Sequence, residues 1–338
     1  MQNLFQVLKK FTNKQEVAVI NREVVVWGYR LFLDREPENE RVILEKLARF
    51  NNSGELRQAF MQSDEFRMNN PYYLSTALSG DEPRMNVEEI SSEAELQILF
   101  KHIQDSWQHL GKTEPYWSVL TSEKFLQANI QNVDTVADFY ETGKNDVSRI
   151  LKTLERNQID YTLFKSCLEY GCGLGRVTRW LAEIFDVVYG YDISQEHLQI
   201  AKKYVDSKNL QNIFLHHLKE ISNIEDLPKV DFIYSVIVLQ HNPPPIIQFI
   251  IRQFIKALNP NGVALFQVPT YRLGYEFSLQ KYLSGEAKRG EMEMHILPQN
   301  QVFEAIRQEG GRLIEVIEDG HTGSRAKEMS NTFLVQKE

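Results

Sequence analysis

The stretch Cys167-Leu-Glu-Tyr-Gly171-Cys-Gly173-Leu-Gly175-Arg176 decides the fold that this sequence predicts. It begins as a short apolar run and becomes rich in glycine where a strand should turn into a helix. Gly171 and Gly173 carry no Cβ, so the backbone there can approach a ligand closely. Ligands bind at the carboxyl ends of the strands of an open α/β sheet. We therefore expect a ligand-binding loop after the first strand of an α/β domain.

Segments of strand and helix character alternate after this loop, as is typical of a parallel sheet with helices on both faces. The fold class expected for residues 161–338 is α/β, with a doubly wound, mostly parallel sheet of seven strands. A further helix is expected to start at Asp146, before the first strand. The strands are expected at residues 166–170, 187–191, 212–216, 231–236, 263–268, 313–317 and 332–336.

The spacing of the glycines distinguishes two kinds of nucleotide ligand. The dinucleotide fingerprint is G-x-G-x-x-G, whereas here the third glycine comes one residue early, at Gly175, and Arg176 follows it. Glu169 lies two residues before the first glycine. Its carboxylate would repel a pyrophosphate but attract an ammonium and a sulfonium group. These residue types favour S-adenosylmethionine over NAD.

An acid also follows the second expected strand, in Tyr191-Asp192-Ile193-Ser194. The end of this strand lies beside the glycine loop, so Asp192 can accept hydrogen bonds from both ribose hydroxyls. The alternative role for Asp192 is that of a turn or helix-capping acid. Because the glycine loop precedes it at the appropriate spacing, we expect Asp192 to bind ribose.

The fourth expected strand runs towards Val236 and then into Gln240-His241-Asn-Pro243. The backbone near Val236 should line the cofactor cleft, and His241 follows on the lip where a methyl acceptor would arrive. A histidine titrates near neutral pH, so His241 is the first candidate for a catalytic base. The alternative is that His241 only packs or orients the loop. His295 is the rival base.

The segment 270–297, which contains His295, combines aromatic and cationic side chains. We expect it to cover the acceptor, because a long segment after the fifth strand usually does so in a fold of this kind. The mixture of side chains could also stack on sugar rings and pair with anionic groups. The alternative is a solvated excursion of the surface. The side chains concerned are Tyr271, Arg272, Tyr275, Lys281, Tyr282, Lys288 and Arg289.

The glycine loop, the acid after the second strand and the Val-Leu-Gln-His ending of the fourth resemble class I S-adenosylmethionine-dependent methyltransferases of type 11/12. The resemblance covers about residues 133–338 and implies a Rossmann-like fold that binds S-adenosylmethionine. Tyr140 and Gly143 would belong to a segment over the methionine end of the cofactor. The cofactor contacts implied are Tyr140, Glu169, Gly171, Cys172, Gly173, Gly175, Arg176, Asp192, Ile193 and Val236.

One stretch departs from the pattern of that family. Many members carry an acid after the third strand that holds the adenine amino group. Here the stretch is His216-His217-Leu218-Lys219-Glu220, so Glu220 or a backbone group is the expected substitute. The two neighbouring histidines do not make a metal site by themselves, and we predict none.

The residues before the α/β domain are predicted to be helical. We expect a helical module at 1–75, a polar linker at 76–91 and a helical extension of the catalytic domain at 92–160. In the first helix the apolar residues that recur at helical spacing are expected to form one stripe: Val17, Ile20, Val24, Trp27 and Leu31. In the second helix, Val42, Leu44 and Leu47 are expected to face inward.

The helical module has a resemblance of its own. The stretch Tyr29-Arg-Leu-Phe-Leu-Asp-Arg-Glu-Pro37, followed by Ser63-Asp-Glu-Phe66, resembles short helical domains beside glycosyltransferases and methyltransferases in bacterial surface-polysaccharide pathways. That resemblance implies a docking module without catalysis, through which a protein partner could bind.

Composition limits the classes of function. The chain has 338 residues, 42% of them hydrophobic and 25% charged, as expected for a soluble protein of two domains. The net charge of -8 argues against broad binding to nucleic acid. No apolar run suits a signal peptide or a membrane span, and Cys167 and Cys172 are expected to be reduced thiols, so we expect a cytoplasmic protein.

The combined expectation is an enzyme that uses S-adenosylmethionine to methylate a sugar hydroxyl in a bacterial glycan or its precursor. One alternative is a methyltransferase for a protein side chain, a lipid or another small molecule. The other is a non-catalytic protein that binds the cofactor or serves as a scaffold.

Overall fold

A computed structural model describes residues 20–69, 78, 80, 82–130, 133–285, 292–322 and 328–338. The chain divides into two compact units, Met1–Thr76 and Ala77–Glu338. No helix among the described residues has the length and apolar character needed to cross a membrane.

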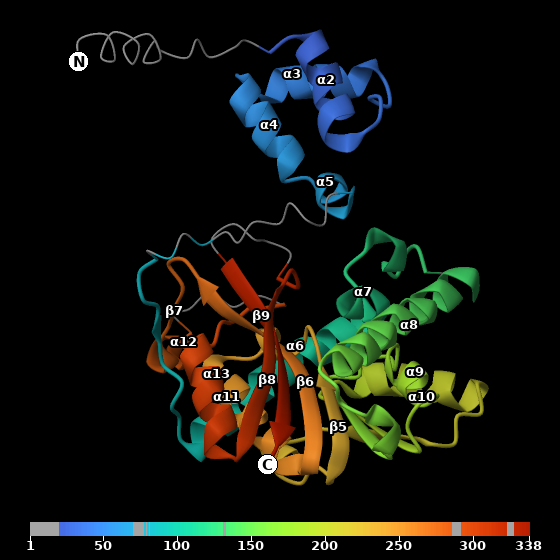
Figure 1. The fold of residues 1–338 in the computed structure, drawn as a ribbon, viewed down its shortest axis with the longest axis vertical. Helices are drawn as coiled ribbons and strands as arrows, with labels where there is room; N and C mark the ends of the chain where they lie inside the picture. The colour runs from blue at the N-terminus through green and yellow to red at the C-terminus, as the bar shows by residue number, and fades with distance from the viewer. Residues whose placement is uncertain are drawn as a thin grey trace. The chain divides into compact units, whose positions relative to one another are not determined.

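The first unit is a cluster of helices around a small aromatic core (Figure 1). Asn21, Asn39 and Asn52 cap the first three helices, each accepting a hydrogen bond from a backbone amide of the first turn. Tyr29 packs edge-on against Phe60 at the centre of the unit. The helices are α2 (Arg22–Leu33), α3 (Glu40–Arg49), α4 (Ser53–Met61) and α5 (Asp64–Asn69).

The predicted apolar stripe contributes to the core only in part: Ile20 and Val24 pack against it, and Val17 lies outside the described residues. Trp27 and Leu31 are 48% and 72% exposed, whereas the core side chains come from the neighbouring face, Val25, Val26, Tyr29 and Leu33. The reason is Gly28, where any Cβ would overlap the ring of Phe60 and which therefore sets the face that packs on α4. In α3, Val42 and Leu47 pack against the core as predicted, whereas Leu44 is exposed and Ile43 is buried in its place.

The second unit has the predicted α/β fold. A sheet of seven strands has the order β4-β3-β2-β5-β6-β9-β8, with β9 antiparallel to its two neighbours and the other pairs parallel. A doubly wound, mostly parallel sheet is therefore confirmed. The strands are β2 (Ser166–Tyr170), β3 (Val187–Asp192), β4 (Ile213–His217), β5 (Val230–Ser235), β6 (Leu258–Arg272), β8 (Gly311–Asp319) and β9 (Glu328–Lys337).

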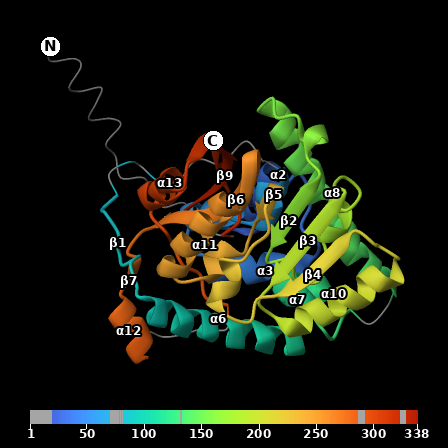
Figure 2. The same cartoon turned by 90° about the horizontal axis from the view of Figure 1, so that it is seen from below.

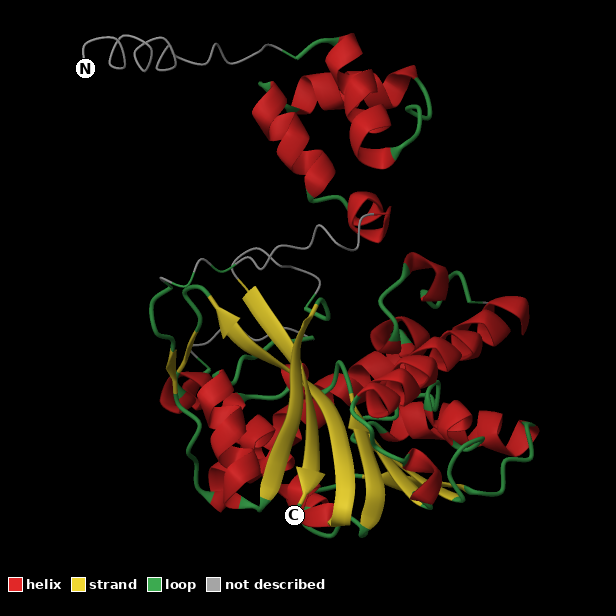
Figure 3. Ribbon diagram, in the orientation of Figure 1, coloured by secondary structure: helices red, strands yellow, loops and turns green. Residues whose placement is uncertain are grey.

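Helices cover both faces of this sheet, as Figures 1 and 3 show, with α11 and α13 on one side and α8, α9 and α10 on the other. Each face of the sheet has its own hydrophobic core, and alternate residues of a strand point into one core or the other. On β5, Ile233 packs towards α11 and Phe232 towards α8. The helices are α6 (Glu93–Thr113), α7 (Pro115–Val119), α8 (Val133–Arg156), α9 (Thr178–Leu181), α10 (Gln195–Ser207), α11 (Pro244–Ala257), α12 (Leu279–Ser284) and α13 (Gln299–Gln308).

The helix expected to start at Asp146 in fact starts at Val133. Gly143 lies in the interior of this helix, α8, where glycine is normally unfavourable by about 1 kcal/mol. A Cβ at Gly143 would overlap the carbonyl oxygen of Arg176, so only glycine allows α8 to pack this closely on the glycine loop. Tertiary packing here overrides the local propensity that suggested a later start.

Short elements complete the unit. The two-stranded pair β1 (Asn86–Val87) and β7 (Glu276–Phe277) joins part of the predicted linker to the segment after β6. Helix α6 packs against both α10 and α11, and Figure 2 shows it running along the bottom of the view, from near α12 towards α10. The 3₁₀ turns are η2 (Glu123–Phe125), η3 (Tyr161–Leu163), η4 (Ile221–Ile224) and η5 (Leu239–His241).

Candidate active site

The glycine loop turns sharply at the end of β2. Gly171 and Gly173 have φ angles of 77° and 52°, in the left-handed region that favours glycine. A Cβ on Gly171 would also overlap the side chain of Val238, which follows β5. The amide of Gly171 donates to the carbonyl oxygen of Tyr191 at 2.7 Å, so the loop is anchored on the neighbouring strand β3.

Asp192 ends β3 directly beside this loop and is 7% exposed. Its Oδ2 accepts a hydrogen bond from the amide of Gly173 at 2.7 Å, and its Oδ1 accepts one from the amide of Ser194 at 2.8 Å. Each carboxylate oxygen can accept a further hydrogen bond. The carboxylate is thereby fixed by the backbone and still able to receive hydroxyl groups.

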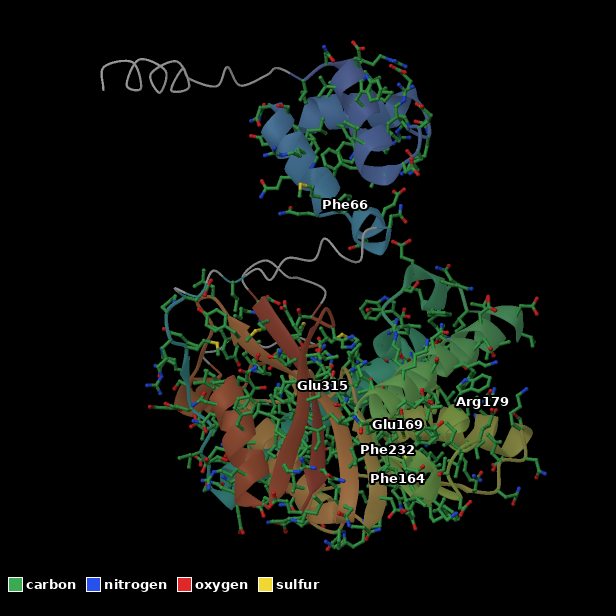
Figure 4. All side chains as sticks on the ribbon, in the orientation of Figure 1. Phe66, Phe164, Glu169, Arg179, Phe232 and Glu315 are labelled. Atoms are coloured by element: carbon green, nitrogen blue, oxygen red, sulfur yellow. The ribbon has the colours of Figure 1, made fainter. Side chains whose placement is uncertain are left out.

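Glu169 lies on β2 just before the loop and is labelled in Figure 4. Burial raises the pKa of its carboxyl to about 8, although a hydrogen bond from Thr178 and the charge of Arg176 act in the opposite direction. A buried carboxyl of this kind is stabilised in its charged form by a cation placed next to it. The position therefore favours a positively charged ligand group.

Arg176 connects the loop to α8. Its Nη1 donates to Oδ2 of Asp146 at 2.5 Å and to the hydroxyl of Thr142 at 3.2 Å. Its Nε is buried and has no hydrogen-bond partner among the described residues. Because an unsatisfied buried N–H is unfavourable, this donor marks a place for a ligand acceptor such as a carboxylate.

These groups line one cavity at the carboxyl ends of the strands. The ends of β2, β3 and β5 form its floor, and the region around α6 and α7 forms a wall. Several lining residues were not predicted from the sequence, because they come from segments distant from the glycine loop: Ile103, Trp107, Ser118, Val119, Leu120, Asp146, His197 and His321.

A family model described as a methyltransferase domain matches residues 139–308. The chain belongs to this methyltransferase family. The resemblance to class I S-adenosylmethionine-dependent methyltransferases is thereby confirmed, and the chain is an enzyme of that kind. The match contains the glycine loop and Asp192. It does not contain α6, β8 or most of the cavity-lining residues that were not predicted from the sequence.

A curated relative is the ubiquinone biosynthesis O-methyltransferase of Shewanella sp. (strain ANA-3). It is 27% identical over 121 residues, which make up 35% of this chain and 50% of the relative. The methyltransferase described here thus spans half the length of that relative.

Solved structures of similar fold include two methyltransferases. Magnesium protoporphyrin IX methyltransferase from Synechocystis PCC 6803 gives a TM-score of 0.48 at 15% identity, over 70% of this chain and 99% of that one. The N-methyltransferase NodS from Bradyrhizobium japonicum WM9 gives a TM-score of 0.43 at 15% identity, over 69% and 98% of the two chains.

Eight of the ten predicted cofactor contacts of the methyltransferase line the cavity: Glu169, Gly171, Cys172, Gly173, Arg176, Asp192, Ile193 and Val236. Tyr140 and Gly175 are not among the lining residues. The hydroxyl of Tyr140 donates instead to the carbonyl oxygen of Leu174 at 3.2 Å, and its ring stacks on Tyr204 with centroids 3.4 Å apart. Tyr140 therefore supports the glycine loop from outside the cavity.

His241, the first candidate base, also lies outside the cavity lining. Its Nδ1–H donates to the carbonyl oxygen of Glu293 at 2.8 Å, and its Nε2 accepts from the side chain of Gln240 at 3.3 Å. Burial lowers the pKa of His241 to about 4. With both ring nitrogens bonded inside the protein, the geometry favours the packing role over that of a base.

His295, the rival base, is held in the same way. Its Nε2–H donates to a carboxylate oxygen of Glu293 at 2.9 Å, and its Nδ1 accepts from the hydroxyl of Tyr275 at 2.9 Å. His295 does not line the cavity either. The two histidines belong to one polar network inside the domain.

The predicted cover over the acceptor does not face the cavity in the part of residues 270–297 that the structure describes. Four of its aromatic and cationic side chains bond within the unit: Tyr271 to the carbonyl of Pro83, Arg272 to Glu328, Tyr275 to His295 and Tyr282 to Glu293. Lys288 and Arg289 lie outside the described residues. The segment therefore stabilises the domain around its buried histidines.

The region after β4 also differs from the expectation. Leu218 lines the cavity, whereas Glu220 is exposed and caps the turn η4. The side chain of Gln104 donates to the carbonyl oxygen of Leu218 at 3.0 Å and so ties α6 to the end of β4. Ile103 and Trp107 of the same helix line the cavity, which makes this end apolar.

At the opposite lip Ile237 has a φ angle of 60°, which is strained for a β-branched residue. Its amide donates to Oε1 of Gln267 at 3.0 Å. The amide group of Gln267, fully buried on β6, donates in turn to Gln240 at 3.1 Å and to Ser330 at 2.7 Å. This network holds the strained backbone in place at the mouth of the cavity.

Proposed function

We propose that this methyltransferase transfers the methyl group of S-adenosylmethionine to a hydroxyl oxygen, with a sugar hydroxyl of a glycan or its precursor as the acceptor. The identity of the methyl donor rests on one observation. Glu169 and Asp192 lie near the ends of the neighbouring strands β2 and β3, in one cavity with the glycine loop. When bound, S-adenosylmethionine supplies a methyl group already activated on a sulfonium.

The residues present fit that donor. Glu169 offers a buried carboxyl for the ammonium group, and the unpartnered Nε of Arg176 offers a donor for the carboxylate. Asp192 offers carboxylate oxygens to the ribose hydroxyls, and the apolar slot of Ile103 and Trp107 suits the flat adenine.

The charge of the lining supports a neutral acceptor. The described residues of the cavity include Asp146, Glu169 and Asp192, against Arg176, which is already paired with Asp146. An anionic acceptor would be repelled in such a site, whereas a hydroxyl group would not. The resemblance of the helical module to those of surface-polysaccharide pathways supports a sugar as the carrier of that hydroxyl.

A second candidate acceptor is the hydroxyl of a flat, apolar small molecule such as a phenol. The mouth of the cavity carries Val236, Ile237 and Val238, which favour an apolar acceptor over a sugar. The relative named for ubiquinone biosynthesis is an O-methyltransferase. Both candidates share oxygen as the methylated atom.

The first unit supports a further part of the proposal, a protein partner. Trp27 and Leu31 lie in an open groove between α2 and α4, together with Phe32 and Leu56. Exposed apolar side chains in one groove are typical of protein-binding surfaces. The module would then recruit the enzyme to the place where its acceptor is made.

The test is transfer of a tritium-labelled methyl group from S-adenosylmethionine to three acceptor sets: neutral oligosaccharides, nucleotide sugars and simple phenols. We expect the label to be incorporated into the neutral oligosaccharides. We expect no label on the enzyme. Label only in phenols would replace the sugar by the second candidate. Absence of cofactor binding in calorimetry would overturn the donor half as well.

A further inference from the structure

His321 lines the cavity from the connection between β8 and β9, close to the C-terminus. It was not predicted as a site residue, because nothing in the sequence near it resembles a motif. Its amide donates to a carboxylate oxygen of Asp319 at 3.0 Å, which fixes the backbone at the start of the connection. The side chain is partly exposed.

The topology places His321 on the side of the cavity away from the donor groups. Glu169, Asp192 and Val236 come from β2, β3 and the end of β5. In the strand order, β6, β9 and β8 follow on the other side of β5. Because β8 is parallel to β5, its carboxyl end reaches the same edge of the sheet. His321 is the cavity-lining residue, among those described, that comes from this second half of the sheet.

The ring of His321 differs from those of the two predicted bases in its bonding. None of the residues that the structure describes bonds to either of its ring nitrogens. His241 and His295, in contrast, have both ring nitrogens engaged and do not line the cavity. His321 therefore has a lone pair that is free to accept a proton from a molecule in the cavity.

Three other polar side chains of the cavity lining are less suited to this task. Asn242 cannot take up a proton, and its amide group donates to the carbonyl oxygen of Val238 at 2.9 Å. Asp146 is engaged by Arg176. Burial raises the pKa of Tyr234 well above its ordinary value, so that residue stays protonated.

We propose that His321 is the catalytic base, an assignment that rests on the proposed function. A ring nitrogen of His321 accepts the hydroxyl proton of the acceptor while the oxygen forms its bond to the methyl carbon. The bond from that carbon to sulfur breaks, and its electron pair stays on sulfur, so the sulfonium becomes a neutral thioether. The proton then leaves the imidazolium for water.

The first test needs no acceptor. Diethyl pyrocarbonate modifies accessible, unprotonated imidazole, and mass spectrometry of peptides locates the modified histidines. We expect His321 to react in the folded enzyme, to react more slowly with S-adenosylhomocysteine bound, and to react faster than His241 and His295. An unreactive His321, or a His241 that reacts faster, would overturn the assignment.

The second test is turnover with labelled S-adenosylmethionine and the acceptor set that the wild-type enzyme labels. We expect His321→Ala to lower turnover by ~10²–10⁴-fold, and added imidazole to restore part of it, since the position opens on the cavity. His109→Ala, on the exposed face of α6, is the matched control. Binding of S-adenosylhomocysteine should stay within a few-fold in both variants.

The two readouts separate the possible failures. Wild-type turnover in His321→Ala with intact cofactor binding would overturn the role of His321 and leave the proposed function standing. A loss that imidazole does not reverse, together with weakened cofactor binding, would show a structural role for His321 instead.

Discussion

The backbone amide of Gly173 donates a hydrogen bond of 2.7 Å to Oδ2 of Asp192, which joins the glycine loop to the end of the neighbouring strand. The loop and the acid are therefore one structural unit. The carboxylate is already oriented before any ribose arrives, so little ordering is needed on binding.

Replacement of Asp192 by alanine should weaken binding of S-adenosylhomocysteine by ~1–3 kcal/mol, because the ribose hydroxyls and the amide of Gly173 both lose their acceptor. Isothermal calorimetry measures the change. Asp186→Ala removes an exposed aspartate at the start of the same strand and is the control. Equal affinities for the two variants would exclude Asp192 from the binding site.

Binding of S-adenosylmethionine should release protons at pH 7. The pKa of Glu169 is about 8 in the free protein, so its carboxyl is mostly protonated, and a cationic ligand lowers that pKa. Affinity should therefore rise as the pH is raised from 6 to 8. Calorimetry in buffers of different ionisation enthalpy counts the protons, and Glu169→Gln should abolish most of the release. If the number of protons released is unchanged in this variant, the protons come from another group.

Replacement of His241 by glutamine should change stability in a pH-dependent way. The pKa of His241 is lowered from 6.5 to about 4, so between these pH values the unfolded chain takes up a proton that the folded chain does not. The contribution of His241 to the free energy of unfolding therefore falls as the pH is lowered through this window, by about 1.4 kcal/mol per pH unit. Urea unfolding at pH 7 and pH 5 should show a smaller loss for the variant than for the wild type. A parallel loss in both proteins would contradict the lowered pKa.

Gly143→Ala should destabilise the α/β unit by ~1–3 kcal/mol, as overpacking does, even though alanine is the better helix former. The added Cβ would overlap the carbonyl oxygen of Arg176, so α8 must move away from the glycine loop. Asn145→Ala changes an exposed position of the same helix and should have little effect. Thermal unfolding compares the two variants. A stabilised Gly143→Ala protein would show that the contact is loose.

A chain that starts at Leu78 should fold and bind S-adenosylhomocysteine with the affinity of the full chain. The unit Ala77–Glu338 contains all the residues that line the cavity, and the first unit has a core of its own. Circular dichroism and calorimetry on the shortened chain test this. Aggregation of the shortened chain would indicate that the first unit covers apolar surface of the second.

The parts of the site that could be predicted from the sequence are local in the chain. Strand β2 has the predicted bounds, and the glycine loop and Asp192 lie at the ends of adjacent strands as expected. Such features depend on a few consecutive residues and on the rule that parallel strands end at one edge. Strand β6 was predicted only at 263–268 but runs from Leu258 to Arg272, because Leu258 pairs with Val230 of β5 and the residues up to Arg272 pair with β9.

The remaining residues depend on distant contacts that the sequence does not reveal. Trp107 forms part of an apolar helical stripe, and nothing in that stripe shows that one of its members lines a cavity. The bonding of His241 is decided by Glu293, more than fifty residues later. His321 reaches the site only because β9 runs antiparallel and brings the connection after β8 to the cavity edge.

The strained backbone at Ile237 means that the most stable sequence for this fold is not the one the enzyme carries. Glycine or asparagine adopts a φ of 60° at little energetic cost, whereas isoleucine forfeits ~1–2 kcal/mol there. A search for heat-resistant variants would be drawn to this position and would remove a bulky apolar side chain from the entrance to the cavity. A substitution at this one position would then raise thermal stability and at the same time change which acceptors can enter the cavity.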